Sequence, residues 1–99
     1  MFATEFKSLE AVYEQVIELM PNKFDSHEFI LKLAQEHQQL YVKALIEHAE
    51  SEKPFQIVHS QIAMRLLKFP NLVTRVGDHI SKDIFLQENV ATMWEKVVK

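Results

Sequence analysis

The start of a helix at residues 24–29 constrains this chain more than any other feature of its sequence. Asp25 and Glu28 have the Asp-x-x-Glu spacing of a capping box, in which each side chain accepts a hydrogen bond from the other residue's backbone N–H. Phe24 and Phe29 fall at the two positions of a hydrophobic staple. Both carboxylates also lie at the positive end of the helix dipole. These features together predict a helix that begins at Ser26.

This predicted helix is long, because no proline or glycine interrupts the sequence before Pro54. Apolar residues recur along it at helical spacing and form one broad face. Leu31, Val42 and Ile46 form a second, narrower apolar strip beside that face. A helix with two apolar strips is expected to pack against more than one partner. We therefore predict a central helix over residues 26–50, with these three residues as a candidate interaction surface.

The rest of the chain also has helical periodicity, and it predicts an all-α fold. Helices are expected over residues 3–20, 54–69 and 81–99, with a short helical segment over 71–76. A single glycine in 99 residues argues against many tight turns. The prediction is one domain over residues 1–99, a compact bundle of four main helices plus the short segment. The alternative is a small β-wing in residues 72–85, made of strands 72–76 and 79–85.

Composition excludes several classes of protein. The chain has no cysteine, so it forms neither disulfides nor thiolate metal sites. Its N-terminus lacks the basic and apolar regions of a signal peptide, and no apolar run approaches the length of a membrane span. We therefore expect a soluble cytoplasmic protein with no membrane partner. Residues 1–52 contain four Lys or Arg and ten Asp or Glu, whereas residues 53–99 contain seven and four. A nucleic-acid partner is thus disfavoured for the surface as a whole, although the second half leaves room for a local anionic partner.

No catalytic or metal-binding motif is visible, so we expect no enzyme activity and no cofactor. The five histidines lack the spacing of a zinc site, and no glycine-rich phosphate loop or G-x-S-x-G elbow is present. Buried, hydrogen-bonded histidines are the simpler interpretation. The alternative is a ligand pocket between helices, lined by His37, Tyr41 and His48 from the main face of the central helix.

Residues 61–76 resemble a helix-turn-helix segment. Ala63 and Val73 have the ten-residue separation of the small and branched residues that pack its two helices together. Leu67 departs from the pattern, because it stands where that motif usually has glycine. The resemblance implies DNA binding, and its candidate contacts to phosphates or base edges are Arg65, Lys68, Arg75 and Lys82.

The sequence as a whole predicts a non-catalytic helical interaction module. Its expected partner is another protein or a second copy of the chain, which would make a homodimer. A DNA-binding regulator that uses residues 61–76 is the alternative. The apolar strip of Leu31, Val42 and Ile46 supports the first prediction, and the local helix-turn-helix resemblance supports the second.

Overall fold

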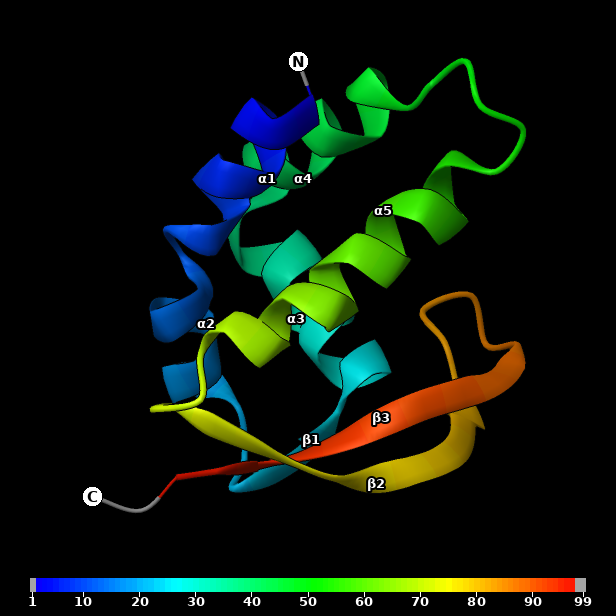
Figure 1. Ribbon diagram of the computed structural model, residues 1–99. Helices are drawn as coiled ribbons and strands as arrows, with labels where there is room; N and C mark the ends of the chain where they lie inside the picture. Colours follow the sequence, from blue (N-terminus) through cyan, green and yellow to red (C-terminus); the bar gives the residue numbers. More distant parts are fainter. Residues whose placement is uncertain (1, 98–99) are drawn as a thin grey trace.

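The chain folds into helices that pack against a small sheet (Figure 1). The computed structural model describes the backbone of residues 2–97 and the side chains of residues 6–97. The elements are α1 (Phe2–Glu10), α2 (Tyr13–Leu19), β1 (Lys23–Asp25), α3 (Ser26–Glu36), α4 (Gln38–Glu47), α5 (Pro54–Met64), the 3-10 turn η1 (Arg65–Lys68), β2 (Val73–Lys82) and β3 (Glu88–Lys96). The three strands are antiparallel and lie in the order β1-β3-β2. In Figure 1 the helices lie on one side of the sheet, and the two ends of the chain are far apart.

The prediction of an all-α bundle is wrong, because the region expected to form the last helix is strand β3. Apolar residues there fit the helical period, but Val90, Thr92 and Trp94 fit the period of two equally well. β3 is the central strand, and its backbone groups pair with β1 on one side and β2 on the other. Pairing with distant segments therefore makes this region a strand, and the local pattern of apolar residues cannot predict such pairing.

The β-wing alternative was nearer to the structure, although it paired the wrong segments. Residues 72–76 and 79–85 are not partners, because most of both belong to the single strand β2. Gly77 lies inside β2, where a register irregularity between Arg75 and Gly77 interrupts the pairing with β3. The chain reverses over residues 83–87 instead, and β2 and β3 form a long hairpin.

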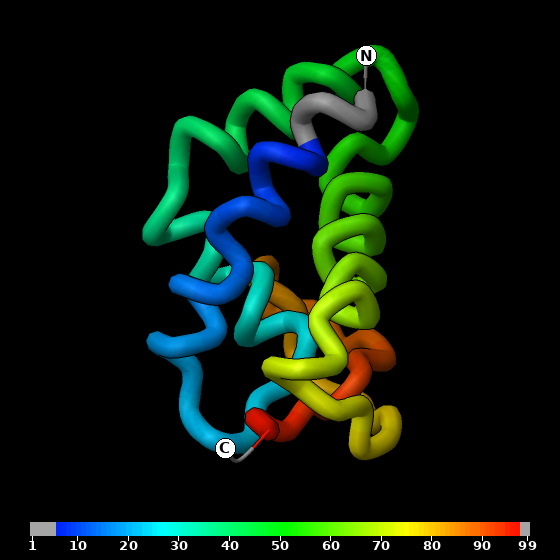
Figure 2. The backbone as a smooth tube through the Cα atoms, turned by 60° about the vertical axis from the view of Figure 1, so that its left-hand side comes forward, coloured from blue at the N-terminus to red at the C-terminus, as the bar shows by residue number. Residues whose placement is uncertain are grey.

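The single central helix predicted over residues 26–50 is in fact two helices. The backbone leaves helical geometry at His37, with φ −133° and ψ 61°, and the change of direction between α3 and α4 is visible in Figure 2. α4 packs against α1, α3 packs against α2 and β3, and both helices contact α5. The predicted second strip is divided between the two helices, and all three of its residues are exposed. The helix predicted over residues 3–20 is likewise divided between Glu10 and Tyr13 into α1 and α2.

The predicted start of α3 is confirmed. Asp25 accepts a hydrogen bond from the backbone N–H of Glu28, at 2.8 Å, and its own N–H donates to the Glu28 carboxylate at 2.9 Å. The rings of Phe24 and Phe29 are buried and stack with their centroids 6.0 Å apart. The helix expected from Pro54 is present as α5 and η1. No helix in the part of the chain that the structure describes is both long and apolar enough to cross a bilayer.

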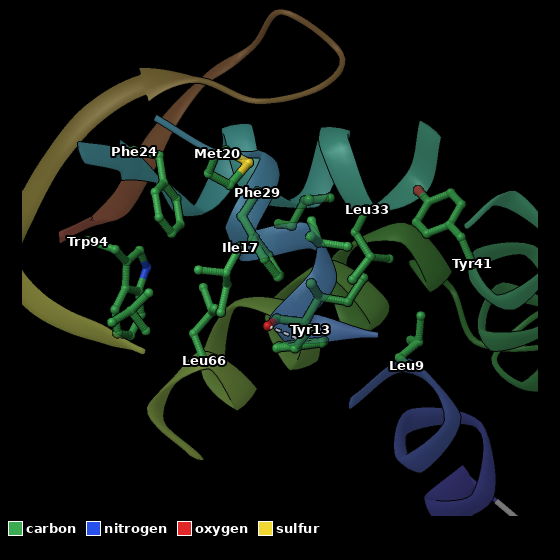
Figure 3. Packing of buried hydrophobic residues seen from close by; sticks show 14 of the residues in the cluster. Leu9, Tyr13, Ile17, Met20, Phe24, Phe29, Leu33, Tyr41, Leu66 and Trp94 are labelled. Atoms are coloured by element: carbon green, nitrogen blue, oxygen red, sulfur yellow. Dashed lines mark hydrogen bonds between the residues drawn. The ribbon is translucent and has the colours of Figure 1, made fainter. Parts of the chain in front are cut away.

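Two aromatic residues join separate elements in the core: Tyr13 joins helices to one another, and Trp94 joins the sheet to α3 (Figure 3). Tyr13 packs against Phe29 and donates its hydroxyl to the Ile62 carbonyl of α5, at 2.6 Å. Trp94 reaches from β3 to α3, where its indole N–H donates to Ser26 Oγ at 3.0 Å. Because both polar atoms are bonded, these large side chains can be buried at little electrostatic cost.

Candidate functional site

The turn between β2 and β3 is held by several hydrogen bonds and exposes a large apolar side chain. Asp83 accepts hydrogen bonds from the backbone N–H groups of Phe85 and Gln87, and from the Asn89 amide. These bonds hold the pKa of Asp83 below its usual range, so the carboxylate stays ionised. Leu86 stands at the tip with φ 66°, in the left-handed region that glycine or asparagine normally occupies. Its side chain is 77% exposed.

Strained backbone with an exposed apolar side chain is typical of a functional contact rather than of a stabilising one. A left-handed leucine costs about 1–2 kcal/mol, and the exposed side chain of Leu86 returns little of this by burial. A glycine at this position would form the same turn without strain. The strain and exposure of Leu86 therefore make this turn a candidate contact site.

Replacing Leu86 with glycine should raise the free energy of unfolding by about 0.5–1 kcal/mol, because relief of strain exceeds the added flexibility of the unfolded chain. Leu86→Ala serves as the matched control, since alanine keeps the strain and should give no gain. Urea denaturation followed by circular dichroism measures both variants. Equal stability of the glycine and alanine variants would mean that the turn stores no strain.

An aromatic cluster joins the hairpin tip to the start of α5. Phe85 contacts Phe55 edge-on, with ring centroids 4.9 Å apart, and stacks on His59 at 6.0 Å. His59 is thereby held between Phe85 and Tyr41, whose ring lies 5.8 Å away on the helical side. Phe55 and Phe85 both remain exposed. The tip is thus fixed against α5, with two aromatic faces still accessible to a partner.

His59 is neutral in this setting. Burial lowers its pKa below that of a free imidazole, and the nearby carboxylate of Asp83 only partly offsets this effect. Its Nε2 lies 2.6 Å from the Tyr41 hydroxyl, a distance that suits a phenol donating to a neutral ring nitrogen. Protonation of His59 would remove this acceptor and place a charge among aromatic rings.

The free energy of unfolding should therefore fall in mild acid, because the unfolded chain binds a proton at His59 more readily than the folded chain does. The unfolded chain binds the proton near the free value of 6.5, while the folded chain binds it only at lower pH. The free energy of unfolding is expected to be constant from pH 8 to about 7 and to fall as pH drops through about 6.5. His59→Gln should have a flatter profile in thermal denaturation between pH 7 and 5.5. An unchanged slope in this variant would exclude His59 as its source.

Two adjoining hollows flank this cluster. A pocket of about 300 Å³ lies between the hairpin tip and the start of α5, with Phe55, Asp83 and Phe85 among its walls. A larger groove of about 520 Å³ lies between α5, the start of α3 and β3. The two share Gln56, His59, Asp83 and Asn89. A partner segment can therefore enter the pocket and continue along the groove.

The outward face of α5 extends the apolar surface. Ile57 and Met64 lie seven residues apart on the same side of the helix and are both exposed, and Leu67 is exposed on η1 directly after it. Between them this side of the helix carries the neutral side chains of Ser60 and Gln61. A face of this composition suits contact with protein more than contact with phosphate groups.

The cations predicted to bind DNA are mostly paired within the chain. Arg65 and Lys68 both bind the Glu10 carboxylate, and Arg65 also lies over the Phe6 ring at 4.7 Å. Burial alone would raise the pKa of Glu10, but the two cations outweigh it and lower the pKa. Arg75 pairs with Asp78 of the same strand at 3.0 Å.

The remaining predicted cation and the predicted motif are also placed differently from expectation. Lys82 lies at the end of β2, opposite Glu88 of β3. Residues 61–76 do not contain two helices, because the expected recognition helix is replaced by a turn and the start of β2. Ala63 and Val73 therefore do not form a helix-turn-helix contact.

The other predicted site residues are found on separate elements. Leu31 is exposed on α3, whereas Val42 and Ile46 are exposed on α4 beyond the break at His37. Their role as an interaction surface stays a prediction. The three residues predicted to line a pocket make separate contacts. His37 forms the junction of α3 and α4, Tyr41 turns toward His59, and His48 packs against the ring of Phe6.

The residues at the hairpin tip carried almost no recognisable signal in the sequence. Asp83 follows Ser81, and this pair suggests a capped helix as readily as a capped turn. Ser81 instead contacts His27 of α3, with Oγ 2.7 Å from Nδ1. The positive φ of Leu86 has no signature at all, because leucine rarely adopts it.

The site is suited to binding, and its chemistry points to no particular reaction. Within the described residues, no group of three or more His, Cys, Asp or Glu side chains is placed to hold a metal ion. The lining groups are apolar, aromatic and amide side chains together with the carboxylates of Glu52 and Asp83 and the ammonium group of Lys53. No protein-family model, no curated protein and no solved structure matches this chain.

Proposed function

We propose that this chain is a non-catalytic protein-interaction domain whose binding surface is the hairpin tip together with the outward face of α5. The observation that carries the proposal is Leu86, an exposed apolar side chain held by a braced turn in a conformation unfavourable to leucine. Such a residue reduces the stability of the free chain. It is accounted for if a partner buries its side chain.

The composition of the surrounding surface supports a protein partner. Large apolar side chains are exposed at Phe85 and Leu86 on the turn, and at Ile57 and Met64 on α5. Aromatic residues and methionine are enriched at protein interfaces, where charged residues are depleted. A rigid presentation also lowers the entropy lost on binding. A cytoplasmic setting is part of this proposal, since a chain without cysteine needs no oxidising compartment.

DNA binding is the second candidate, and the arrangement of α5 beside a β-hairpin is the observation in its favour. A helix that enters the major groove needs cations for the phosphates on either side. Here Arg65 and Lys68 both pair with Glu10, which leaves one net positive charge among the three, and the outward face of α5 is uncharged between Lys53 and Arg65. We expect only weak duplex binding that disappears between 50 and 200 mM salt, as for non-specific contacts.

A displayed library of protein fragments tests the proposal. Fragments enriched on the wild-type chain should lose at least about tenfold in affinity for the double variant Ile57→Ser, Met64→Ser, since each buried apolar anchor contributes about 1–3 kcal/mol. Val42→Ser is the control, because Val42 is equally apolar and exposed on α4. If the Val42 variant alone loses affinity for the fragments, the binding surface lies on α4 and not on α5. Light scattering over a concentration series would measure the molecular mass and show whether the partner is a second copy of the chain.

A further inference from the structure

The pocket between the hairpin tip and α5 has the chemistry of a cation site. Its walls include the rings of Phe55 and Phe85 and the carboxylates of Glu52 and Asp83. Its volume is about 300 Å³, which exceeds that of one side chain and leaves room for part of a ligand's backbone. This inference rests on the proposed function, since it specifies one side chain of the partner that the hairpin surface binds.

The carboxylate of Asp83 places a negative charge in the wall of this pocket, where it can attract a cation. It stays ionised, because backbone N–H groups and the Asn89 amide lower its pKa. No ion pair to Asp83 occurs among residues 6–97. Lys53 is the one cation among the lining residues and, with Glu52, leaves the pocket a net negative charge. An ionised carboxylate without a cation beside accessible aromatic faces favours a positively charged ligand group.

The aromatic walls specify what kind of cation fits. Phe85 lies nearly parallel to the His59 ring and edge-on to Phe55, and half of the residue remains exposed at the pocket that Asp83 also lines. A planar guanidinium group can stack on an aromatic ring and donate a hydrogen bond to Asp83 Oδ2, which keeps one free acceptor position because Oδ1 already accepts two bonds and Oδ2 one. An ammonium group is more strongly hydrated and lacks the flat shape. We propose that this pocket binds the guanidinium group of an arginine side chain carried by the partner protein.

Titration of the full chain, labelled with ¹⁵N, against N-acetyl-arginine-N-methylamide tests this proposal by NMR. Amide signals of Gln56, Asp83 and Phe85 should shift together, with half-saturation at about 10 mM, since exposed cation–π and ion-pair contacts are individually weak. The citrulline analogue has the same shape without the charge, and it should bind at least about fivefold more weakly.

Variants at exposed positions separate the pocket from the rest of the surface. Phe85→Leu keeps an apolar side chain but removes the aromatic face, and should weaken arginine binding about threefold. Glu52→Gln should weaken arginine binding about twofold, because it removes a negative charge from the pocket wall. Lys53→Gln should strengthen arginine binding about twofold, because it removes a positive charge. Leu19→Ala changes an exposed apolar residue on α2, away from the pocket, and should have no effect. The NMR spectrum of each variant confirms that it is folded.

Three results would overturn the arginine site. The first is an absence of shifts up to about 50 mM of the arginine compound. The second is equal shifts with the citrulline analogue or with N-acetyl-lysine-N-methylamide, and the third is unchanged arginine binding in Phe85→Leu. Fragment binding that persists alongside any of these results leaves the interaction domain standing and removes only the arginine pocket. Arginine-dependent shifts without any fragment binding would establish the pocket and remove the interaction surface of Ile57 and Met64.

Discussion

Replacing Trp94 with alanine should lower the free energy of unfolding by about 3–5 kcal/mol. The indole is 3% exposed, lies on the central strand β3 and stands opposite Phe24 of β1 in the sheet register. Its N–H also donates to Ser26, which starts α3. Truncation therefore leaves a cavity where the sheet meets the helices. Because Trp94 is the only tryptophan, unfolding in urea should be followed by circular dichroism.

Two further variants separate burial from hydrogen bonding. Trp94→Phe keeps most of the apolar area but loses the donor to Ser26, and should cost about 1–2 kcal/mol. Val90→Ala on the same strand removes a side chain that is 69% exposed, and should cost less than about 0.5 kcal/mol. If Trp94→Ala costs no more than Val90→Ala, Trp94 does not join the sheet to the helices.

Replacing Asp25 with alanine should cost about 2–3 kcal/mol, because one buried carboxylate satisfies several groups. It caps α3 through the N–H of Glu28 and lies 3.0 Å from Nε2 of His79 on β2. Only 4% of the residue is exposed, so water cannot replace these bonds. The alanine variant leaves the Glu28 N–H and the start of α3 without an acceptor. Urea denaturation at pH 7 measures the loss.

Asp25→Asn distinguishes capping from charge, since asparagine retains the capping oxygen and should cost only about 1 kcal/mol at pH 7. Burial would raise the pKa of Asp25, but bonds from Glu28, Ser81 and His79 lower it overall. The charge therefore stabilises the fold above the free value of 3.8, and this contribution is lost as pH falls through the lower folded pKa. The gap between wild type and Asp25→Asn should narrow in acid. A constant gap down to about pH 3 would show that the charge is not responsible.

The fold was predictable where the determinant is local. The capping box at Asp25 and Glu28, and the helix that begins at Pro54, depend on neighbouring residues and are present in the structure. The division at His37 has no proline or glycine to mark it, and it lets α4 pack on α1 while α3 packs on α2 and β3. β3 had a helical spacing of apolar residues, and only pairing with distant β1 and β2 makes it a strand.

The candidate site was less predictable than the fold. Exposed apolar residues on α3 and α4 were predicted from a helical pattern, and no such pattern exists for a five-residue turn. The contribution of Asp83 depends on how backbone N–H groups of Phe85 and Gln87 converge on it. Charge counts overstated the cations available to a nucleic acid, because Glu10 is brought by folding beside Arg65 and Lys68.

The most direct test of the binding surface compares stability and binding in Leu86→Gly. The fragments enriched on the wild-type chain would be titrated against this variant, with urea denaturation measured on the same samples. We expect the variant to be more stable by about 0.5–1 kcal/mol and to bind at least about fivefold more weakly. A variant that gains stability and binds as tightly as wild type would contradict the account, because the strained leucine would then have no contact to explain it.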